Sequence, residues 1–508
     1  MADAVDASSA FSSTTAPVAA LDADTLFIPV FGHDDTLGDL VGLDQATGGE
    51  LSRARQTGEF RSKLYETFQA RPAGGDWRAR RVVFIGAGAL AEADATRIRR
   101  VAAAASYVAR RLASEDVAFV IRRVPRPLGA AQLVADGLQV AAFDTGGYKR
   151  DDPPLPWRWR RVQIAVPGGD ADALADAVRR GHVIGGAANF ARALANEPGN
   201  VLAPATFADR LASVLSDAGL AVDVLDQARI EALGLRLLLG VARASAQPPR
   251  LVVIRHEPAN AATERVLGLV GKGVTFDTGG ISLKPPTDMD RMKGDMTGGA
   301  AVAAAMLAIA TLGGRHRVIG VIPMVENMPG GNAIRPGDVI EGASGRTVEI
   351  TNTDAEGRLI LADALWHARQ LGATHLVDVA TLTGACMIAL GYSVSGLFGN
   401  DDGWTETVRA TAIEAGDRVW PMPIYEEALD QLRSDIADLV NAAGRYGGAV
   451  TAAAFLKEFA GDGPWAHVDV AGTAWAEKRE PYQAKGPTGV AVRLLTALGL
   501  SAGRSDRA

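Results

Sequence analysis

Short apolar runs alternate with a helical pattern in the first third of the chain. The segment 90–112 is rich in alanine and has the length of a helix, whereas the apolar runs are short enough to be strands. The runs that predict strands are 25–30, 81–85, 117–122 and 137–143. Strands that alternate with helices indicate an α/β domain, which we expect at 22–168. Residues 1–21, rich in Ala, Ser, Thr and Asp, are expected to form a flexible tail.

A long helical pattern follows the loop Pro167-Gly168-Gly169-Asp170 and stops before Pro198. We interpret residues 169–197 as a helix that connects two domains. The second domain, at 198–500, is the larger, and a short tail at 501–508 follows it. Its apolar runs predict strands at 251–254, 266–270, 317–323, 347–350 and 375–379.

These strands are apolar almost throughout rather than at alternate positions, which is typical of a sheet covered on both faces. The segment 299–309 is apolar all round and predicts a buried helix. The expected fold class is therefore α/β in both domains, with a central mixed sheet flanked by helices in the larger C-terminal one.

Composition narrows the possible classes of protein. A chain of 508 residues is too long for one ordinary core, and 48% hydrophobic with 22% charged residues is typical of a soluble globular protein. The net charge of −7 argues against a large basic surface for nucleic acid. One cysteine, Cys386, excludes an intrachain disulfide framework and a cysteine-based zinc site, and it fits a reducing compartment. We expect neither a signal peptide nor a membrane span.

Polar residues gather near the ends of predicted strands in the second domain. Lys272 and Asp277 stand among glycines directly after the strand 266–270, where an α/β sheet binds its ligands. Asp354, Glu356 and Arg358 lie in a turn between the strand 347–350 and a helical pattern at 359–368. A third group precedes the buried helix and consists of Asp288, Asp290, Lys293 and Asp295.

These carboxylates have two interpretations. Carboxylates that converge on one crevice repel one another, and a pair of divalent cations would relieve that repulsion. Asp288 or Asp290 alone is more often a helix N-cap, and Asp354 and Glu356 could simply favour the N-terminus of the helix that follows them. Carboxylates at three separate places favour the metal site, but composition and spacing leave both interpretations open.

Rival motifs have little support. The segment 86–91 matches the G-x-G-x-x-A dinucleotide fingerprint, but no acidic residue ends a second strand about 20 residues later. Tight packing is the better explanation of its glycines. The chain has no H-E-x-x-H, P-loop or G-x-S-x-G motif, and its seven histidines are scattered.

The turn between the strand 347–350 and the next helix reads Asn352-Thr353-Asp354-Ala355-Glu356-Gly357-Arg358-Leu359. This segment matches the signature octapeptide of the cytosolic leucyl aminopeptidases without a substitution, so the chain resembles that family. Further similar segments are 270–273, 276–284, 292–296, 380–385, 434–438 and 465–475. The resemblance is strong over 196–500 and holds in outline over the N-terminal third. Gly294 and the segment 196–200 depart from the family's pattern, and both concern the shape of the substrate pocket more than the metal ligands.

The resemblance implies a dinuclear centre of zinc or manganese. It implies that the metal ligands are Lys272, Asp277, Asp295, Asp354 and Glu356. Asp277 and Glu356 would be shared by both ions, Asp354 would complete the tighter site, and Lys272 with Asp295 the more exchangeable one. It further implies the catalytic residues Lys284, at the oxyanion, and Arg358, which would hold a bicarbonate that shuttles the proton. The implied substrate-binding residues are Met292, Thr381, Leu382 and Gly384.

The resemblance also implies the biological setting. We expect a cytoplasmic homohexamer that removes N-terminal residues from peptides, with leucine and other apolar residues preferred. An architectural DNA-binding role, known for some bacterial relatives, is the alternative. The acidic net charge opposes it, although a local basic run stands at 158–161.

Overall fold

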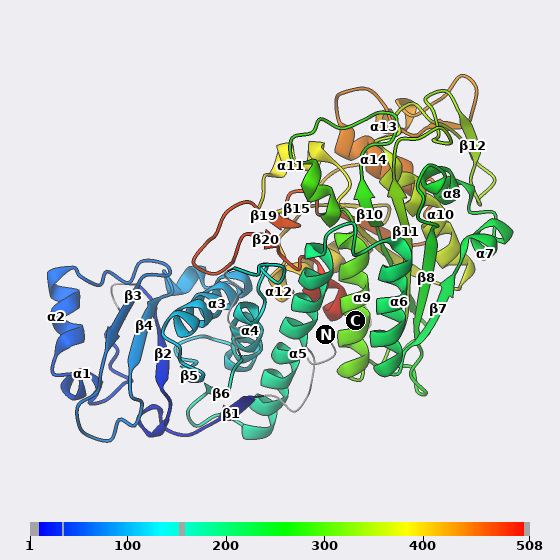
Figure 1. Cartoon of the computed structure of the whole chain (residues 1–508). Coiled ribbons are helices and arrows are strands. Elements are labelled where there is room, and N and C mark those ends of the chain that lie inside the picture. Colours follow the sequence, from blue (N-terminus) through cyan, green and yellow to red (C-terminus); the bar gives the residue numbers. More distant parts are fainter. Residues whose placement is uncertain (1–9, 33–34, 152–157, 502–508) are drawn as a thin grey trace. The chain divides into compact units, whose positions relative to one another are not determined.

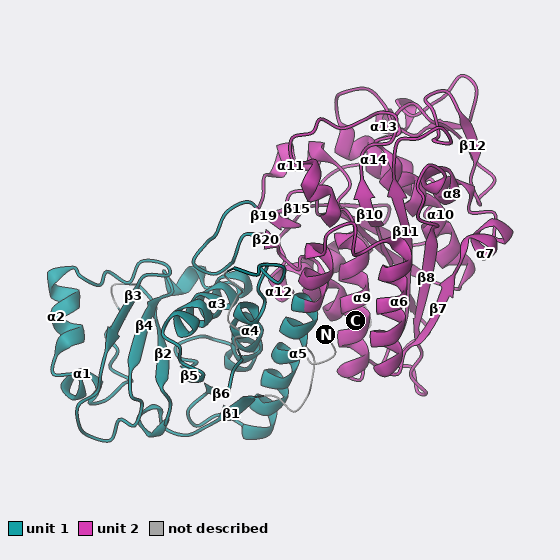
Figure 2. Ribbon diagram, viewed as in Figure 1, with its two compact units in different colours: residues 1–189, 477–485 teal, residues 190–476, 486–508 magenta. Residues whose placement is uncertain are grey.

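The computed structural model describes residues 10–32, 35–151 and 158–501, and the chain divides into two compact units (Figure 1). Unit 1 comprises residues 1–189 and 477–485, and unit 2 comprises 190–476 and 486–508 (Figure 2). The division falls within α5 (Ala171–Asn196), a helix of 26 residues. Both units combine helices with a sheet, so the predicted fold class is confirmed.

Unit 1 is built on a sheet that has six strands among the described residues, in the order β1-β6-β5-β2-β4-β3. The strands are β1 (Phe11–Thr14), β2 (Thr25–Val30), β3 (Thr67–Ala70), β4 (Val82–Gly86), β5 (Asp116–Val120) and β6 (Arg161–Ala165). Neighbouring strands are parallel except β3, which is antiparallel to β4. The helices are α1 (Leu43–Ala46), α2 (Glu50–Thr57), α3 (Ala95–Arg111) and α4 (Pro127–Gln139), and short 3₁₀ turns lie at Val18–Ala20, Leu90–Glu92 and Val140–Ala142.

Two expectations for this unit were wrong. The tail expected at 1–21 contains β1, which pairs in parallel with β6. Its sequence, Phe-Ser-Ser-Thr, lacks an apolar run because it lies at the edge of the sheet and stays partly exposed. The run 137–143 is not a strand but the end of α4 and a 3₁₀ turn. Short apolar runs do not distinguish a strand from a buried helix, and α4 packs closely on α3.

The main sheet of unit 2 has nine strands among the described residues. Eight follow the order β16-β15-β18-β14-β9-β11-β8-β7, and β10 pairs with β11. They are β7 (Ala221–Leu225), β8 (Arg250–His256), β9 (Val266–Gly271), β10 (Gly273–Asp277), β11 (Arg317–Asn327), β14 (His375–Ala380), β15 (Ser395–Gly399), β16 (Val419–Pro421) and β18 (Trp465–Asp469). β8 is antiparallel to β11, and β15 is antiparallel to β18, so the sheet is mixed, as expected.

Helices cover the central strands. α9 (Thr297–Thr311) packs against α15 (Val492–Leu500), whereas α10 (Glu356–Gln370) packs against α8 (Arg236–Ala242) and α14 (Gly448–Lys457). Both α9 and α10 contact β9, β11 and β14. The other helices are α6 (Pro204–Asp217), α7 (Gln227–Ala232), η5 (Met289–Gly294), α11 (Gly384–Leu390), α12 (Asp402–Ala415) and α13 (Glu426–Asp430). Small sheets are formed by β12 (Val339–Glu341), β13 (Thr347–Glu349) and β17 (Leu439–Val440), and by β19 (Trp475–Ala476) and β20 (Gly486–Pro487).

One helical stretch, Met289–Thr311, is long and apolar enough to cross a membrane by length and composition, which the sequence had not led us to expect. Within the described part of the chain, 89% of its most apolar window is buried. It contains α9, whose residues pack between the sheet and α15, so its apolar character is that of a core helix.

Candidate metal and catalytic site

The candidate site lies where strands of the unit 2 sheet end at one edge. β18, β14, β9 and β11 are each parallel to the next, and β10 runs parallel to β11. Parallel strands end at the same edge, and open α/β sheets bind ligands outside these carboxyl ends. The polar residues at or just beyond the ends are Lys272, Asp277, Asn327, Thr381 and Asp469.

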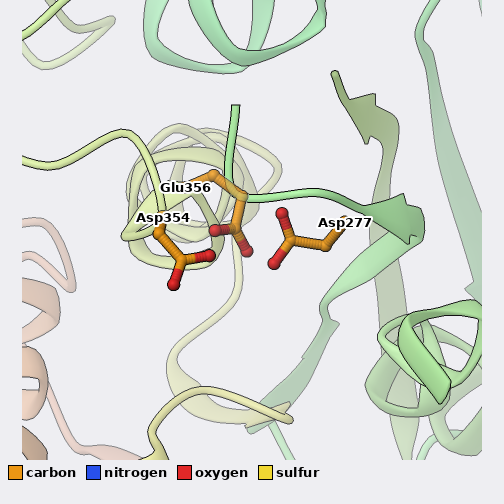
Figure 3. A group of neighbouring side chains, drawn as sticks. All are labelled: Asp277, Asp354 and Glu356. Carbon is orange, nitrogen blue, oxygen red and sulfur yellow. The ribbon is translucent and has the colours of Figure 1, made fainter. Parts of the chain in front are cut away.

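Three carboxylates meet at this edge (Figure 3). Asp277 ends β10, Asp354 lies in the turn before α10, and Glu356 is the first residue of α10. One oxygen from each carboxylate lies within 4.8 Å of the other two, and Figure 3 shows the side chains pointing toward one another. Carboxylate oxygens are ligands for Zn²⁺, Mn²⁺ and Mg²⁺ alike.

Lys272 and Asp295 adjoin this group. The Nζ atom of Lys272 lies 2.8 Å from an oxygen of Asp295 and 2.8 Å from an oxygen of Glu356. It also donates to the main-chain oxygen of Thr381 at 2.9 Å. Burial alone would lower the pKa of Lys272, but the charges of Asp295 and Glu356 outweigh burial and raise it. The chain alone therefore holds Lys272 as an ammonium ion.

A second lysine, Lys284, lies beside Asp277 and Asp354. The Nζ atom of Lys284 lies 2.7 Å from an oxygen of Asp277 and also contacts Asp354. Burial opposes the charged form, yet the charges of Asp277 and Glu356 raise the pKa of Lys284. Lys284 thus presents a lasting positive charge beside the cluster.

The charges of the cluster do not balance. Four carboxylates stand against two ammonium groups, which leaves two negative charges. Burial, with the charge of Asp277, raises the pKa of Glu356, and burial raises the pKa of Asp295 and of Asp354. Carboxyl pKa values rise where too few positive charges lie nearby to stabilise the carboxylate form. Divalent cations would supply the missing positive charge. The donor set therefore fits a metal centre.

Two glycines allow the close approach of these segments. Gly279 follows β10 with φ of +87°, and a Cβ there would lie 2.9 Å from Oδ1 of Asp354. A Cβ at Gly357, in the first turn of α10, would lie 2.8 Å from Nζ of Lys272. A Cβ at Gly279 would also lie 2.5 Å from the main-chain oxygen of Ser282, so a larger residue there would push the loop away. A larger residue at Gly357 would displace the Lys272 side chain from the cluster.

Arg358 follows the cluster in α10 and is buried. Its Nη1 donates to the main-chain oxygen of Asn441 at 2.9 Å, while its Nε is buried without a hydrogen-bond partner among the described residues. Burial lowers the pKa of Arg358 to about 10, against the charges of Glu356 and Asp469. A buried guanidinium with an unused N–H group can bind an anion.

The residues predicted to bind substrate occupy two segments. Met292 lies in η5, three residues before Asp295. Thr381 and Leu382 directly follow β14, and the Thr381 hydroxyl donates to Oδ1 of Asp295 at 2.7 Å. Gly384 begins α11, and a Cβ added there would meet no atom within 4 Å.

Of the third group of polar residues in the sequence, which precedes the buried helix, only some members lie at the site. Asp295 contacts Lys272, but Asp288 pairs with Arg291 at 3.2 Å, and Lys293 donates to the main-chain oxygen of Asn196 at 2.7 Å. Asp288 therefore pairs with an arginine of its own turn and not with the carboxylate cluster. Asp288 itself stands before η5, but its side chain makes no capping hydrogen bond.

Sequence reasoning missed two asparagines that support the site. Asn327, at the end of β11, donates from Nδ2 to Asp277 at 2.8 Å and to the main-chain oxygen of Thr353 at 3.1 Å. Asn441 accepts from Thr351 N at 2.8 Å and donates to the main-chain oxygen of Asn352 at 2.7 Å. A polar residue that ends an apolar strand was a usable signal for Asn327, whereas Asn441 follows a strand of two residues and left no such signal.

The rival motifs have structural explanations. A Cβ at Gly86 would lie 1.9 Å from the main-chain oxygen of Lys63, so that glycine permits close packing of two chain segments. Arg160 and Arg161 of the basic run both pair with Asp116, at 3.2 and 2.8 Å.

A largely buried cluster of carboxylates and lysines lies at the carboxyl edge of a mixed sheet, and this arrangement is typical of metal-dependent α/β enzymes. Comparison with known proteins narrows the class. The model of the cytosol aminopeptidase family's catalytic domain matches residues 189–496, and that of its N-terminal domain matches residues 28–152. The chain therefore belongs to the cytosol aminopeptidase family and is a metallo-exopeptidase.

Individual relatives agree with this assignment. A probable cytosol aminopeptidase of Solibacter usitatus is 44% identical over 484 residues, which are 95% of this chain and 98% of that protein. One of Koribacter versatilis is 47% identical over 370 residues, 73% of this chain and 72% of that protein. Among solved structures, the bottromycin maturation enzyme BotP in complex with Mn superposes with a TM-score of 0.80 at 36% identity, covering 94% of this chain and 100% of that one.

Proposed function

We propose that this chain removes the N-terminal residue from peptides, with leucine and other apolar residues preferred, at a centre of two zinc or manganese ions. The observation that carries the proposal is the group of Asp277, Asp354 and Glu356, with oxygens within 4.8 Å of one another and Lys272 beside it. The presence of Mn in the BotP structure supports the choice of metals.

The division of the ligands follows the family resemblance. Asp277 and Glu356 would serve both ions, and Asp354 would complete one site. Lys272 and Asp295, whose Nζ and carboxylate oxygen lie 2.8 Å apart, would complete the other. Lys272 can serve as a ligand only as the neutral amine, so binding there must release its proton. Two bound divalent ions would lower the pKa of a coordinated water and polarise the scissile carbonyl.

Lys284 and Arg358 would carry the remaining chemistry. Lys284 holds a positive charge beside Asp277 and Asp354, where it can stabilise the oxyanion that develops on the carbonyl. Arg358 would hold a bicarbonate through its unused Nε, because a guanidinium matches a planar anion. That bicarbonate would accept and return the proton. Met292, Thr381, Leu382 and Gly384 would line the place of the substrate.

We also propose a homohexamer in the cytoplasm. Large apolar side chains are exposed on several segments of unit 2, and they include Ile388, Tyr392, Trp420, Tyr425, Ile436 and Tyr446. An interface between subunits would remove such side chains from water, which favours association. The names of the relatives, cytosol aminopeptidases, support the location.

Hydrolysis of leucyl p-nitroanilide tests the proposal. We expect activity after addition of Mn²⁺ or Zn²⁺ to the chelated protein, and little with N-acetylleucyl p-nitroanilide, which lacks the free amine. Equal hydrolysis of both compounds would refute the exopeptidase assignment for this substrate class. Full activity after exhaustive chelation would refute the metal centre.

The DNA-binding alternative has less support, because Arg160 and Arg161 are paired with Asp116 and the net charge is −7. A gel shift at physiological salt would test it, and we expect no retardation of duplex DNA.

A further inference from the structure

The segment 381–384, between β14 and α11, is tied to the candidate metal ligands at its first residue. The main-chain oxygen of Thr381 accepts from Nζ of Lys272 at 2.9 Å. The Thr381 hydroxyl donates to Oδ1 of Asp295 at 2.7 Å. The position of this segment and the position of two candidate ligands therefore depend on each other.

The next two residues of the segment are held by one buried carboxylate, Asp469. The side chain of Asp469 accepts from Leu382 N at 3.3 Å through Oδ1 and from the Thr383 hydroxyl at 2.7 Å through Oδ2. Oδ1 also accepts from Ala471 N at 3.1 Å, and Asp469 as a whole is 1% exposed. A buried carboxylate is costly unless it is hydrogen-bonded, and two of the three bonds to Asp469 come from the segment 381–384, through Leu382 N and the Thr383 hydroxyl.

The strand register explains why position 469 can do this. β14 and β18 are parallel neighbours, with Ala380 opposite Asp469, and both strands end there. Val470 N donates to the main-chain oxygen of Ala380 at 2.8 Å. An acceptor side chain at the last residue of β18 therefore reaches the residues that directly follow β14.

The same contact also fixes α11. Thr383 is the N-cap of α11, and its hydroxyl oxygen accepts from Cys386 N at 3.0 Å while it donates to Asp469. At the other end of the helix, a Cβ on Gly472 would lie 2.2 Å from the main-chain oxygen of Gly391. Both ends of α11 therefore adjoin the chain at the end of β18.

We propose that Asp469 is a positioning residue for the aminopeptidase reaction, which sets the segment 381–384 through Leu382 and Thr383 so that Thr381 meets Lys272 and Asp295. The proposal rests on the proposed function, because it assumes that this segment lines the substrate's place. Among the described residues, the hydrogen bonds of the Asp469 side chain go to Leu382, Thr383 and Ala471 and to none of the candidate metal ligands, so Asp469 acts through the segment 381–384.

Asp469→Asn is the direct test, because the amide keeps the size of the side chain but replaces the acceptor that faces the Thr383 hydroxyl. Substitutions in the shell around metal ligands cost about 10–100-fold in activity or metal affinity, and we expect kcat/KM to fall within that range. At saturating metal, the loss should appear mainly in KM. Amide hydrogens of 382–386 should exchange faster than in the wild type, by mass spectrometry.

Thr383 supplies matched variants. Thr383→Val removes the hydroxyl and should reproduce the rise in KM, whereas Thr383→Ser keeps it and should restore wild-type kinetics. In the double variant Asp469→Asn with Thr383→Val, kcat/KM should fall little further than in either single variant, because both substitutions break the same contact. As a control, Asp417→Asn alters a buried carboxylate that accepts from Leu494 N at 3.1 Å, and it should lower stability without changing KM.

Three results would overturn the proposal. They are unchanged kcat and KM in Asp469→Asn, equal losses in Thr383→Ser and Thr383→Val, and unchanged exchange of 382–386. Failure of the proposed function is distinguishable. A metal-loaded wild type without aminopeptidase activity would refute that function, and the exchange measurement would then decide by itself whether Asp469 sets the segment.

Discussion

The charges of the buried carboxylates are the main feature of single residues in this site. Glu356 is buried, lies 2.8 Å from Nζ of Lys272, and has a pKa raised by burial and by the charge of Asp277. An isolated carboxylate in such surroundings would be protonated, whereas divalent cations keep it ionised as a ligand. The functional role of each carboxylate can thus be tested by removing its charge and keeping its size.

We predict that Glu356→Gln loses bound metal and activity together. The loss should exceed the roughly 10–100-fold that substitutions around metal ligands cost, because a direct ligand is removed. Glu326→Gln is the control, since Glu326 is a partly buried glutamate of unit 2 that accepts from the Ser245 hydroxyl at 2.6 Å instead of facing the carboxylate cluster. Metal analysis and leucyl p-nitroanilide kinetics provide the measurements. Glu356→Gln with two ions per chain would contradict the ligand assignment.

For Arg358 we predict a loss of rate without a loss of metal. Arg358→Ala should lower kcat by about 10²–10³, the usual cost of one group that stabilises the transition state. Added bicarbonate should stimulate the wild type more than the variant. Arg358→Lys keeps a charge but not the planar fork, so it should recover little of the stimulation. Equal stimulation of all three proteins would remove Arg358 from the anion-binding role.

Asp35 gives a residue-scale prediction for unit 1. Burial raises its pKa, but hydrogen bonds from Arg122 and from Phe31 N outweigh burial and lower the pKa to about 2. A carboxyl pKa that is lower in the folded state adds stability above the unfolded value of about 3.9, and that stability is lost as pH falls toward 2. Asp35→Asn should therefore destabilise unit 1 most at pH 5 and progressively less at pH 4 and 3. Urea titrations at the three pH values would check this, and a difference that grows on acidification would refute it.

At the scale of elements, the site depends on how closely α9 approaches the ends of β9 and β14. A Cβ at Gly298, in the first turn of α9, would lie 2.0 Å from the main-chain oxygen of Val379, and a Cβ at Gly271 would lie 2.5 Å from the main-chain oxygen of Gly298. The contacting atoms belong to the backbone and cannot rotate away. This contact sets the distance between α9 and the strands that end at the site.

We predict that Gly298→Ala destabilises unit 2 by at least the roughly 1–3 kcal/mol typical of overpacked cores. Gly331→Ala is the control, because a Cβ at Gly331 meets no atom within 4 Å. Urea unfolding of the two variants gives the comparison. A Gly298→Ala variant as stable as Gly331→Ala would mean that α9 is free to shift.

The elements also show what a sequence can and cannot predict. Apolar strands such as β9 and β14 were predictable because burial on both faces leaves an unbroken apolar run. Lys272 and Asp277, which follow β9, were noticed because α/β sheets bind ligands at the carboxyl ends of their strands. β1 was not predictable, because an exposed edge strand of Ser and Thr has no such run. Asn327 was not predicted as a site residue, because β11 extends four residues beyond the strand expected at 317–323 and ends at Asn327. Contacts between distant segments, such as those of Asp469, follow from strand order, which periodicity does not encode.

At the scale of the whole molecule, the distribution of exposed apolar side chains bears on assembly. In unit 2, Ile388 and Tyr446 are 87% and 82% exposed, although large apolar side chains are usually buried. Ile388 lies in α11, which adjoins α14, and Tyr446 stands just before α14. Association through this part of unit 2 would cover both residues.

We predict a mass near six times 52.9 kDa by light scattering at micromolar concentration. Ile388→Glu combined with Tyr446→Glu should reduce that mass, since an interface does not readily bury two new charges. Val41→Glu, at an 83% exposed apolar residue of unit 1, should leave it unchanged. We further expect the active sites of the hexamer to face a shared interior. Such an interior would restrict access to peptides and unfolded ends, so folded proteins should be poor substrates of the wild type. A monomer that is fully active at nanomolar concentration would refute both the hexamer and the restriction on access.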